Sequence, residues 1–260
     1  MLTVLRDAVN AFPPSTPLLV VSPHFDDAAF SCAALLDRGD PVDVLTVFAG
    51  EPRPPVRGWW DEQCGFASSA ESVRARRQED EQALAPEGHR LLYLDLLELQ
   101  HFDGPRPAAE AEPIVEAVRA WSAQARGGTV ALPAGAGWAP HWLPPRAAIK
   151  LRRPRGPEPH ADHVFVRDAV LGAGLDDVRL VLYEELPYLW GGSAARAARR
   201  AAASQGLRAR KNVIPVDREA KARRIAAYAS QVPHMSPAWG HLDSPGTLPA
   251  TECYWRLVSR

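Results

Sequence analysis

Short apolar runs recur along the chain, and segments with a helical pattern lie between them. The runs are continuous rather than alternating, which is typical of strands buried on both faces of a parallel sheet. We predict strands at residues 17–22, 42–48, 89–95, 128–133 and 178–184. Helical segments follow several of these runs or lie between them. This order predicts a Rossmann-like, doubly wound α/β fold, with a mostly parallel sheet, right-handed crossovers and helices on both faces.

The first predicted strand ends directly before a cluster of polar residues. His24, Phe25, Asp26 and Asp27 separate it from a predicted helix over residues 28–36. They therefore lie at the carboxyl end of a strand, where open α/β sheets bind ligands. The side chains of His24 and Asp27 are three positions apart and can converge on one ion. Asp26 is offset from them and can face an ion-bound water, so that it would transfer a proton.

A second polar segment repeats this spacing much later in the chain. His160 and His163 are three positions apart, just ahead of a helical pattern over residues 164–170. One of the two completes a set of two histidines and one carboxylate, which leaves positions open for water and substrate, as in catalytic zinc and non-haem iron sites. The other can act as an acid or stabilise an oxyanion. An Asp pair at a helix start is also a common N-cap, but two such segments together favour a metal site.

A strand followed by His-x-Asp-Asp, with a later His-x-Asp-His, resembles the LmbE-like or PIG-L family of metal-dependent de-N-acetylases. Further matches lie at residues 76–80, 92–95, 183–188 and 228–231, so the resemblance spans nearly the whole chain. It implies a zinc-dependent hydrolase, with Fe²⁺ or Co²⁺ as other possible ions. The implied reaction removes an N-acetyl or N-acyl group from an N-acetylglucosaminyl-type amino sugar or a glycosylated small molecule, and releases acetate and a free amine.

The resemblance also implies a role for each motif residue. His24, Asp27 and His163 would hold the metal, Asp26 would be the general base, and His160 would be the electrophilic or acid partner. The expected partner is therefore a small-molecule substrate, with no nucleic acid involved.

Outside the two motifs, the resemblance assigns Arg76 to substrate contact and Asp95 to an acidic position near the sugar. Two positions depart from the family pattern. Phe25 replaces the usual proline after the first histidine, and Ala28 replaces the glutamate that commonly follows the Asp pair. Neither position is an implied ligand or the base, so we expect the chemistry to be retained while the floor of the pocket differs.

Two irregular segments are predicted to be active-site loops. Residues 50–65 follow the second strand, and Trp59 and Trp60 within them can either stack on a sugar ring or anchor the loop on the protein body. Residues 134–159 form the second loop. Its basic run at 146–155 can meet an anionic group of the substrate or be solvated surface.

Beyond these loops, Glu184 and Glu185 end the fifth predicted strand, where one of them can face the cleft as the partner of a metal ligand or of a substrate hydroxyl.

Composition fits one enzyme domain over residues 1–260. The net charge of -1 gives no attraction to nucleic acid or to an acidic membrane. No apolar run reaches the roughly 18 to 20 residues of a membrane span. Cys32, Cys64 and Cys253 are scattered and odd in number, so we expect free thiols and a cytoplasmic location.

Two other functions are compatible with these patterns. One is a metal-dependent amidase that acts on a non-sugar amide or a thiol conjugate. The other is a non-catalytic carbohydrate-binding protein that has kept the fold, although a binding protein has no need of the acid Asp26 beside the ion. The sequence does not determine the oligomeric state.

Overall fold

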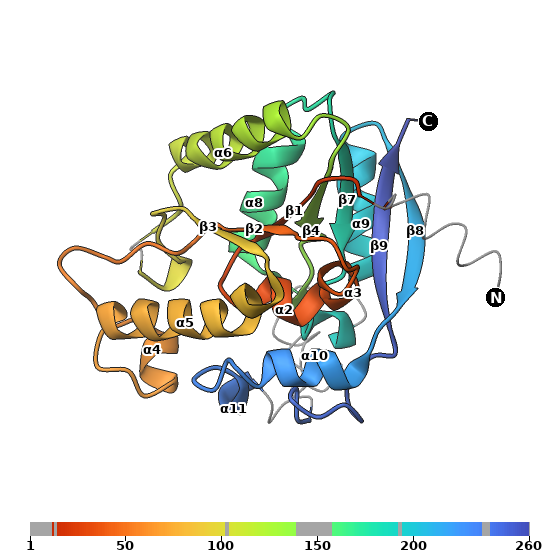
Figure 1. Ribbon diagram of the computed structural model, residues 1–260. Coiled ribbons are helices and arrows are strands. Elements are labelled where there is room, and N and C mark those ends of the chain that lie inside the picture. The colour runs from red at the N-terminus through yellow and green to blue at the C-terminus, as the bar shows by residue number, and fades with distance from the viewer. Residues whose placement is uncertain are drawn as a thin grey trace, which may run out of the picture.

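A computed structural model describes residues 12, 15–101, 104–138, 158–191, 194–235 and 240–259. Within this part of the chain, a seven-stranded sheet has the order β3-β2-β1-β4-β7-β9-β8 (Figure 1). Its strands are β1 (Leu18–Ser22), β2 (Asp43–Thr46), β3 (Arg90–Tyr93), β4 (Thr129–Pro133), β7 (Arg179–Tyr183), β8 (Arg208–Pro215) and β9 (Thr251–Val258). A separate antiparallel pair joins β5 (Gly137–Trp138) to β6 (Glu158–Pro159).

The five strands predicted from the apolar runs are the five that pair in parallel, β3, β2, β1, β4 and β7. The α/β prediction is therefore confirmed. The sequence pattern did not predict the last two strands, β8 and β9. β9 pairs antiparallel with β7, and β8 pairs antiparallel with β9 and forms one edge of the sheet.

Helices cover both faces of the sheet, as predicted (Figure 1). One face carries α2 (Asp27–Ser31), α3 (Ala33–Leu36), α5 (Ser69–Leu84) and α10 (Arg218–Ile225). The other carries α6 (Ala111–Gln124), α8 (Ala161–Leu171) and α9 (Ala194–Ser204). The remaining helical segments are α4 (Trp59–Gln63), α11 (Val232–Met235), η1 (Ala85–Glu87), η2 (Leu99–His101), η3 (Ala108–Glu110) and η4 (Tyr188–Gly191).

Strand β1 shows why the apolar runs are continuous. Leu18 and Val20 lie in the hydrophobic cluster on the α2 face, whereas Leu19 and Val21 lie in the cluster on the α8 face. A strand with helices on both sides is apolar at nearly every position, because alternate side chains point to opposite faces. β1 is therefore fully buried and is a rigid support for the turn that follows it.

The helix predicted over residues 28–36 is instead two short helices, α2 and α3, which meet at Cys32. The second helix starts where the carboxylate of Glu252, on β9, accepts hydrogen bonds from the backbone N–H groups of Ala33 (3.0 Å) and Ala34 (2.8 Å). A distant side chain thus supplies the N-terminal partner that the local sequence lacks.

Of the predicted loop over residues 134–159, the structure describes only the two ends, which meet in the β5–β6 pair. The predicted basic run at 146–155 lies outside the described residues. Among the helices that the structure describes, none is long and apolar enough to cross a bilayer.

Candidate metal centre and active site

The two polar motifs meet because their strands are neighbours in the sheet. β1 pairs in parallel with β4, so the chain leaves both strands at the same edge. The first motif forms the turn from β1 into α2. The second lies at the start of α8, where His160 occupies the N-cap position. The fold therefore brings together the two motifs, which are far apart in sequence, as predicted.

The Asp pair does not serve as a simple helix cap. Asp26 occupies the N-cap position of α2, but its side chain makes no capping hydrogen bond. The Asp27 carboxylate accepts a hydrogen bond from the backbone N–H of His24 (2.8 Å), and its Oδ2 also lies 3.2 Å from His24 Nδ1. Both carboxylates are buried, with exposed fractions of 4% for Asp26 and 5% for Asp27, and a buried charge is costly unless it is paired or binds a metal ion.

One ligand atom from each of His24, Asp27 and His163 lies within 4.8 Å of the others. Asp27 Oδ2 is 3.2 Å from His24 Nδ1 and 3.3 Å from His163 Nε2. Tetrahedral zinc with bonds of about 2.0–2.1 Å requires donor atoms about 3.3 Å apart. His163 Nε2 is buried without a hydrogen-bond partner among the described residues. These three side chains therefore fit a divalent ion.

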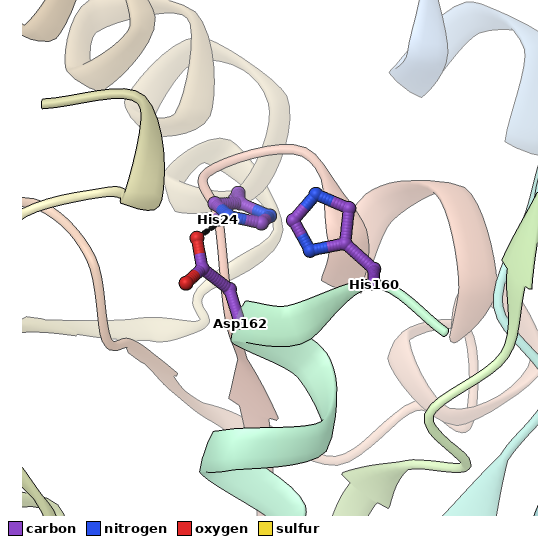
Figure 2. Close-up of side chains that lie close together, drawn as sticks. All are labelled: His24, His160 and Asp162. Carbon is purple, nitrogen blue, oxygen red and sulfur yellow. Dashed lines mark hydrogen bonds and ion pairs between the residues drawn. The ribbon is translucent and has the colours of Figure 1, made fainter. Parts of the chain in front are cut away.

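Each histidine of this set has a carboxylate beside its other ring nitrogen. His24 Nε2 lies 3.1 Å from Asp162 Oδ2 (Figure 2), and His163 Nδ1 lies 3.4 Å from Glu185 Oε1. Such carboxylate–histidine pairs orient the ring and fix the tautomer, which leaves the opposite nitrogen free to bind a metal. Assigned in this way, His24 Nδ1 and His163 Nε2 are the free nitrogens, and both face Asp27.

Those two carboxylates are themselves fixed in place. Arg106 Nη2 donates to Asp162 Oδ1 (2.7 Å), and the backbone N–H of Leu99 donates to Asp162 Oδ2 (3.1 Å). Glu185 Oε1 accepts from the backbone N–H groups of Gly135 (2.6 Å) and Ala136 (2.9 Å). Of the two acids at the end of the fifth predicted strand, Glu185 is thus the one that lies beside His163, and it is fully buried. No role was predicted for Asp162, although it stands between the two motif histidines.

A second group, His24, His160 and Asp162, also has ligand atoms within 4.8 Å of one another (Figure 2). The two groups share His24. Asp162 is already engaged by a guanidinium and a backbone N–H, and it lies on the Nε2 side of His24. These contacts leave the group built on Asp27 and His163 as the one with donor atoms still available.

Asp26 and His160 stand beside the ligand set with unpaired atoms. Asp26 Oδ2 and His160 Nδ1 are both buried without a hydrogen-bond partner in the described part of the chain. Burial raises the pKa of Asp26 to about 6, and the negative charge of Asp27 adds to the rise. Burial lowers the pKa of His160 to about 3, with the positive charges of His163 and His24 acting in the same direction. At neutral pH, Asp26 is mostly ionised and His160 is neutral.

A cavity of about 480 Å³ opens at this point. It is lined by the predicted residues His24, Asp26, Asp27, Trp59, Trp60, Arg76 and His160, together with Phe30, Gln63, Glu98, Leu99, Gln100, Asp162, Leu186, Pro187, Tyr188, His234 and Met235. His163 lies behind this surface and is fully buried. The metal set, the unpaired acid and the tryptophan loop therefore share one space.

The acid closest to Arg76 in this wall is Glu98, which was not predicted. Arg76 Nη1 donates to Glu98 Oε1, and the Arg76 guanidinium carbon lies 5.5 Å from the centre of the Phe25 ring. Phe25, the departure from the family pattern, is thus part of the support for Arg76. Asp95 is exposed and does not line the cavity, and its backbone forms an isolated bridge with Phe48. Glu98 follows β3 by a few residues, and no periodicity marks it.

The predicted loop over residues 50–65 contains a short helix, α4, which carries both tryptophans. Trp60 Nε1 donates to Gln231 Oε1 (2.6 Å) and is thereby tied to the body of the protein. Trp59 has an exposed fraction of 65% and packs edge-on against Trp60, with ring centres 5.5 Å apart. Trp60 therefore anchors the loop, and Trp59 presents its ring at the rim of the cavity.

A mostly parallel α/β sheet with two histidines, an aspartate and an unpaired acid at its carboxyl edge is the arrangement expected of a metal-dependent hydrolase. The chain belongs to the PIG-L family, because the family model described as GlcNAc-PI de-N-acetylase matches residues 19–173. This confirms the predicted family and, at family level, the predicted deacetylase class.

Several solved structures are similar over nearly the whole chain. The A40926 pseudoaglycone deacetylase Dbv21 is 25% identical, with 94% of this chain and 97% of that chain covered and a TM-score of 0.65. A triple mutant of a deacetylase of teicoplanin biosynthesis is 24% identical, with 94% and 99% covered and a TM-score of 0.67. A deacetylase–teicoplanin complex is 24% identical, with 94% of this chain and 99% of that chain covered and a TM-score of 0.65. Among curated proteins, none matches the chain.

Proposed function

We propose that this protein is a zinc-dependent deacetylase whose substrate is an N-acylated amino sugar carried on a larger glycosylated small molecule. The single observation that carries the catalytic part is the position of Asp27 Oδ2, 3.2 Å from one histidine nitrogen and 3.3 Å from another, with the unpaired Asp26 next to it. Iron or cobalt would suit the same donors, and their availability contributes to the choice of ion.

The donor set would be His24 Nδ1, Asp27 Oδ2 and His163 Nε2. An ion held there supplies a Lewis acid and lowers the pKa of a bound water toward neutrality. Asp26 accepts the proton of the attacking water at its unpaired Oδ2, and its pKa of about 6 keeps it available as a base at neutral pH. The same carboxyl then holds the proton that the departing amine needs, because an unprotonated amine is a poor leaving group.

His160 would stabilise the transition state as a neutral donor. Its ring lies against His24, with ring centres 5.0 Å apart, and burial keeps it uncharged at working pH. One ring N–H can donate to the acyl oxygen as negative charge develops there, which is the kind of fixed donor that accelerates acyl transfer.

The other cavity walls suit a sugar with a larger attachment. Arg76 and Glu98 form a buried ion pair that presents polar atoms of both signs to sugar hydroxyl groups. Trp59 offers an exposed aromatic face at the rim, where the C–H face of a ring can stack. The similar structures named for A40926 pseudoaglycone and teicoplanin deacetylation support an amino sugar on a glycosylated natural product as the substrate.

We place the enzyme in the cytoplasm, because Cys32, Cys64 and Cys253 are free thiols, as expected in a reducing compartment.

The test is acid release from a substrate panel by the zinc-loaded protein. The panel contains N-acetylglucosamine, an N-acetylglucosaminyl glycoside with a large aromatic aglycone, and an N-acetyl amide without a sugar. We expect the glycoside to have the highest kcat/KM and the sugar-free amide to be inactive. Equal turnover of all three would indicate a general amidase, and no release from any would contradict the proposal.

A further inference from the structure

The side chain of Tyr188 completes a group of four aromatic rings at the catalytic end of the cavity. Its ring centre lies 5.4 Å from that of His163, at an interplanar angle of 88°, and 5.9 Å from that of His160. The ring centres of His160 and His163 are themselves 4.7 Å apart, and His24 lies within 5.3 Å of both. The ring of Tyr188 therefore lies nearly as close to His160 and His163 as the ring of His24 does.

The hydroxyl of Tyr188 has no partner in the described part of the protein, although the side chain lines the cavity. The other tyrosines of the interior differ in this respect. Tyr183 donates to the backbone oxygen of Val21 (2.9 Å), and Tyr228 donates to Asp80 Oδ1 (2.8 Å). Because Tyr188 lines the cavity and no described residue accepts from or donates to its hydroxyl, that hydroxyl is available to a ligand bound there.

The segment that carries Tyr188 is held on both sides. The backbone N–H of Leu186 donates to Ser31 Oγ on α2 (3.0 Å), and that of Leu189 donates to the backbone oxygen of Glu185 (2.7 Å). Glu185 in turn faces His163. Tyr188 is thus connected to the metal motif through fixed contacts, and a donor that is already in position costs little reorganisation during the reaction.

We propose that the Tyr188 hydroxyl is a catalytic donor that hydrogen-bonds the acyl oxygen of the substrate as negative charge develops on it. The proposal rests on the proposed deacetylase function. As water adds to the carbonyl carbon, the π electron pair moves to the oxygen, and Tyr188 stabilises that charge without giving up its proton. A phenol is an O–H donor at neutral pH. Asp26 still transfers the proton that it took from water to the departing amine. The C–N bond then breaks, and the products are the carboxylic acid and the free amine.

The test is Tyr188→Phe, which keeps the ring against His160 and His163 and removes only the hydroxyl. Loss of one oxyanion donor lowers kcat by about 10²–10³-fold, and we expect this loss with KM and metal content unchanged. The matched control is Tyr183→Phe, which removes a hydroxyl that is bonded to Val21 and does not line the cavity. Its kcat should equal that of the unmodified protein.

A second readout does not depend on turnover. A phosphonamidate that mimics the tetrahedral state should bind Tyr188→Phe more weakly, by about the same factor as kcat/KM falls, in a calorimetric titration. Both measurements are expressed per bound metal, so that partial loss of metal or of folded protein does not change the comparison.

The outcomes separate this inference from the proposed function. Unchanged kcat and unchanged analogue affinity in Tyr188→Phe would overturn the role of the hydroxyl while leaving the deacetylase intact. A rise in KM alone would also overturn it, because the hydroxyl would then bind substrate and transition state equally. If the unmodified zinc-loaded protein released no acid from any substrate, the proposed function itself would fail.

Discussion

At the scale of single residues, two adjacent carboxylates have been given opposite environments. The Asp27 Oδ2 lies between two histidine nitrogens; although burial opposes ionisation, the positive charge of His163 holds the pKa of Asp27 well below its usual value. Asp26 has an oxygen with no partner among the described residues, and burial raises its pKa to about 6. Neighbouring acids with separated pKa values are the usual arrangement for a ligand and a base in one site.

This difference predicts two distinct losses of function. Asp26→Asn should keep the metal and lower kcat by about 10²–10⁴-fold, because only the proton acceptor is removed. His163→Ala should lose metal and activity together, since it removes a donor atom. Metal content by elemental analysis and steady-state kinetics on the same preparations measure both effects. Asp168→Asn, an exposed acid on α8, is the control, and full activity in Asp26→Asn would show that the base lies elsewhere.

At the scale of elements, a glutamine from a different segment bonds the backbone at the start of α4. Gln100 Oε1 accepts from the backbone N–H groups of Trp60 (3.0 Å) and Asp61 (3.2 Å). Gln100 Nε2 donates to Glu98 Oε2 (2.6 Å). A β-carbon added at Gly58 would lie 2.3 Å from Gln100 Oε1, so a side chain there would displace the Gln100 amide from its present position. Gln100 thus joins the tryptophan helix to the Arg76–Glu98 pair.

We predict that Gln100→Ala raises KM for the amino-sugar substrate by about tenfold, with kcat and metal content little changed. Loss of these hydrogen bonds weakens the substrate-binding free energy by about 1–2 kcal/mol, because the wall is held less firmly in place. About 1.4 kcal/mol corresponds to a tenfold change in affinity. The Michaelis parameters of this variant are compared with those of Gln124→Ala, which alters an exposed position at the end of α6. A large fall in kcat with unchanged KM would argue against a role in placing the substrate wall.

At the scale of the whole molecule, a buried acid connects three parts of the fold. Asp80 on α5 accepts hydrogen bonds from the hydroxyls of Tyr93 on β3 (3.1 Å) and of Tyr228, which follows α10 (2.8 Å). Burial raises the pKa of Asp80 to about 7, despite these two donors. In the unfolded chain the pKa of an aspartate is about 3.9. The folded state therefore retains a proton that the unfolded state loses.

The sign of the resulting pH dependence follows from linkage. Between about pH 4 and pH 7 the folded protein binds more protons at Asp80 than the unfolded chain, so this group's contribution to stability falls as the pH rises. The slope is at most about 1.4 kcal/mol per pH unit. Asp80→Asn cannot titrate, so its free energy of unfolding relative to the original protein should increase from about pH 4.5 to about pH 7.5. Urea denaturation at several pH values tests this, and parallel pH profiles would contradict it.

The sequence predicted the parallel half of the sheet well and the antiparallel half not at all. β1 and β4 are apolar at nearly every position because they are buried on both faces. β8 carries Arg208, Arg210 and Lys211 at exposed positions on the sheet edge. It therefore lacks the continuous apolar run from which the other strands were predicted. The break in the predicted helix over residues 28–36 was not predicted either. The carboxylate that accepts from the backbone N–H groups at the start of the second helix belongs to Glu252, which is remote in sequence.

The sequence by itself determined the chemistry available at the two motifs: the residue types, their three-residue spacing, and their place at strand ends where a parallel sheet exposes ligands. Only the tertiary structure decided which other groups reach them. Glu98 and Tyr188 come to the cavity, and Glu185 comes to His163 behind it, because the sheet places β4 and β7 in order beside β1 and brings the segments after β3 and β7 to the same edge. Side-chain chemistry and helix or strand periodicity are local properties, whereas the distance between two segments depends on the packing of the whole sheet.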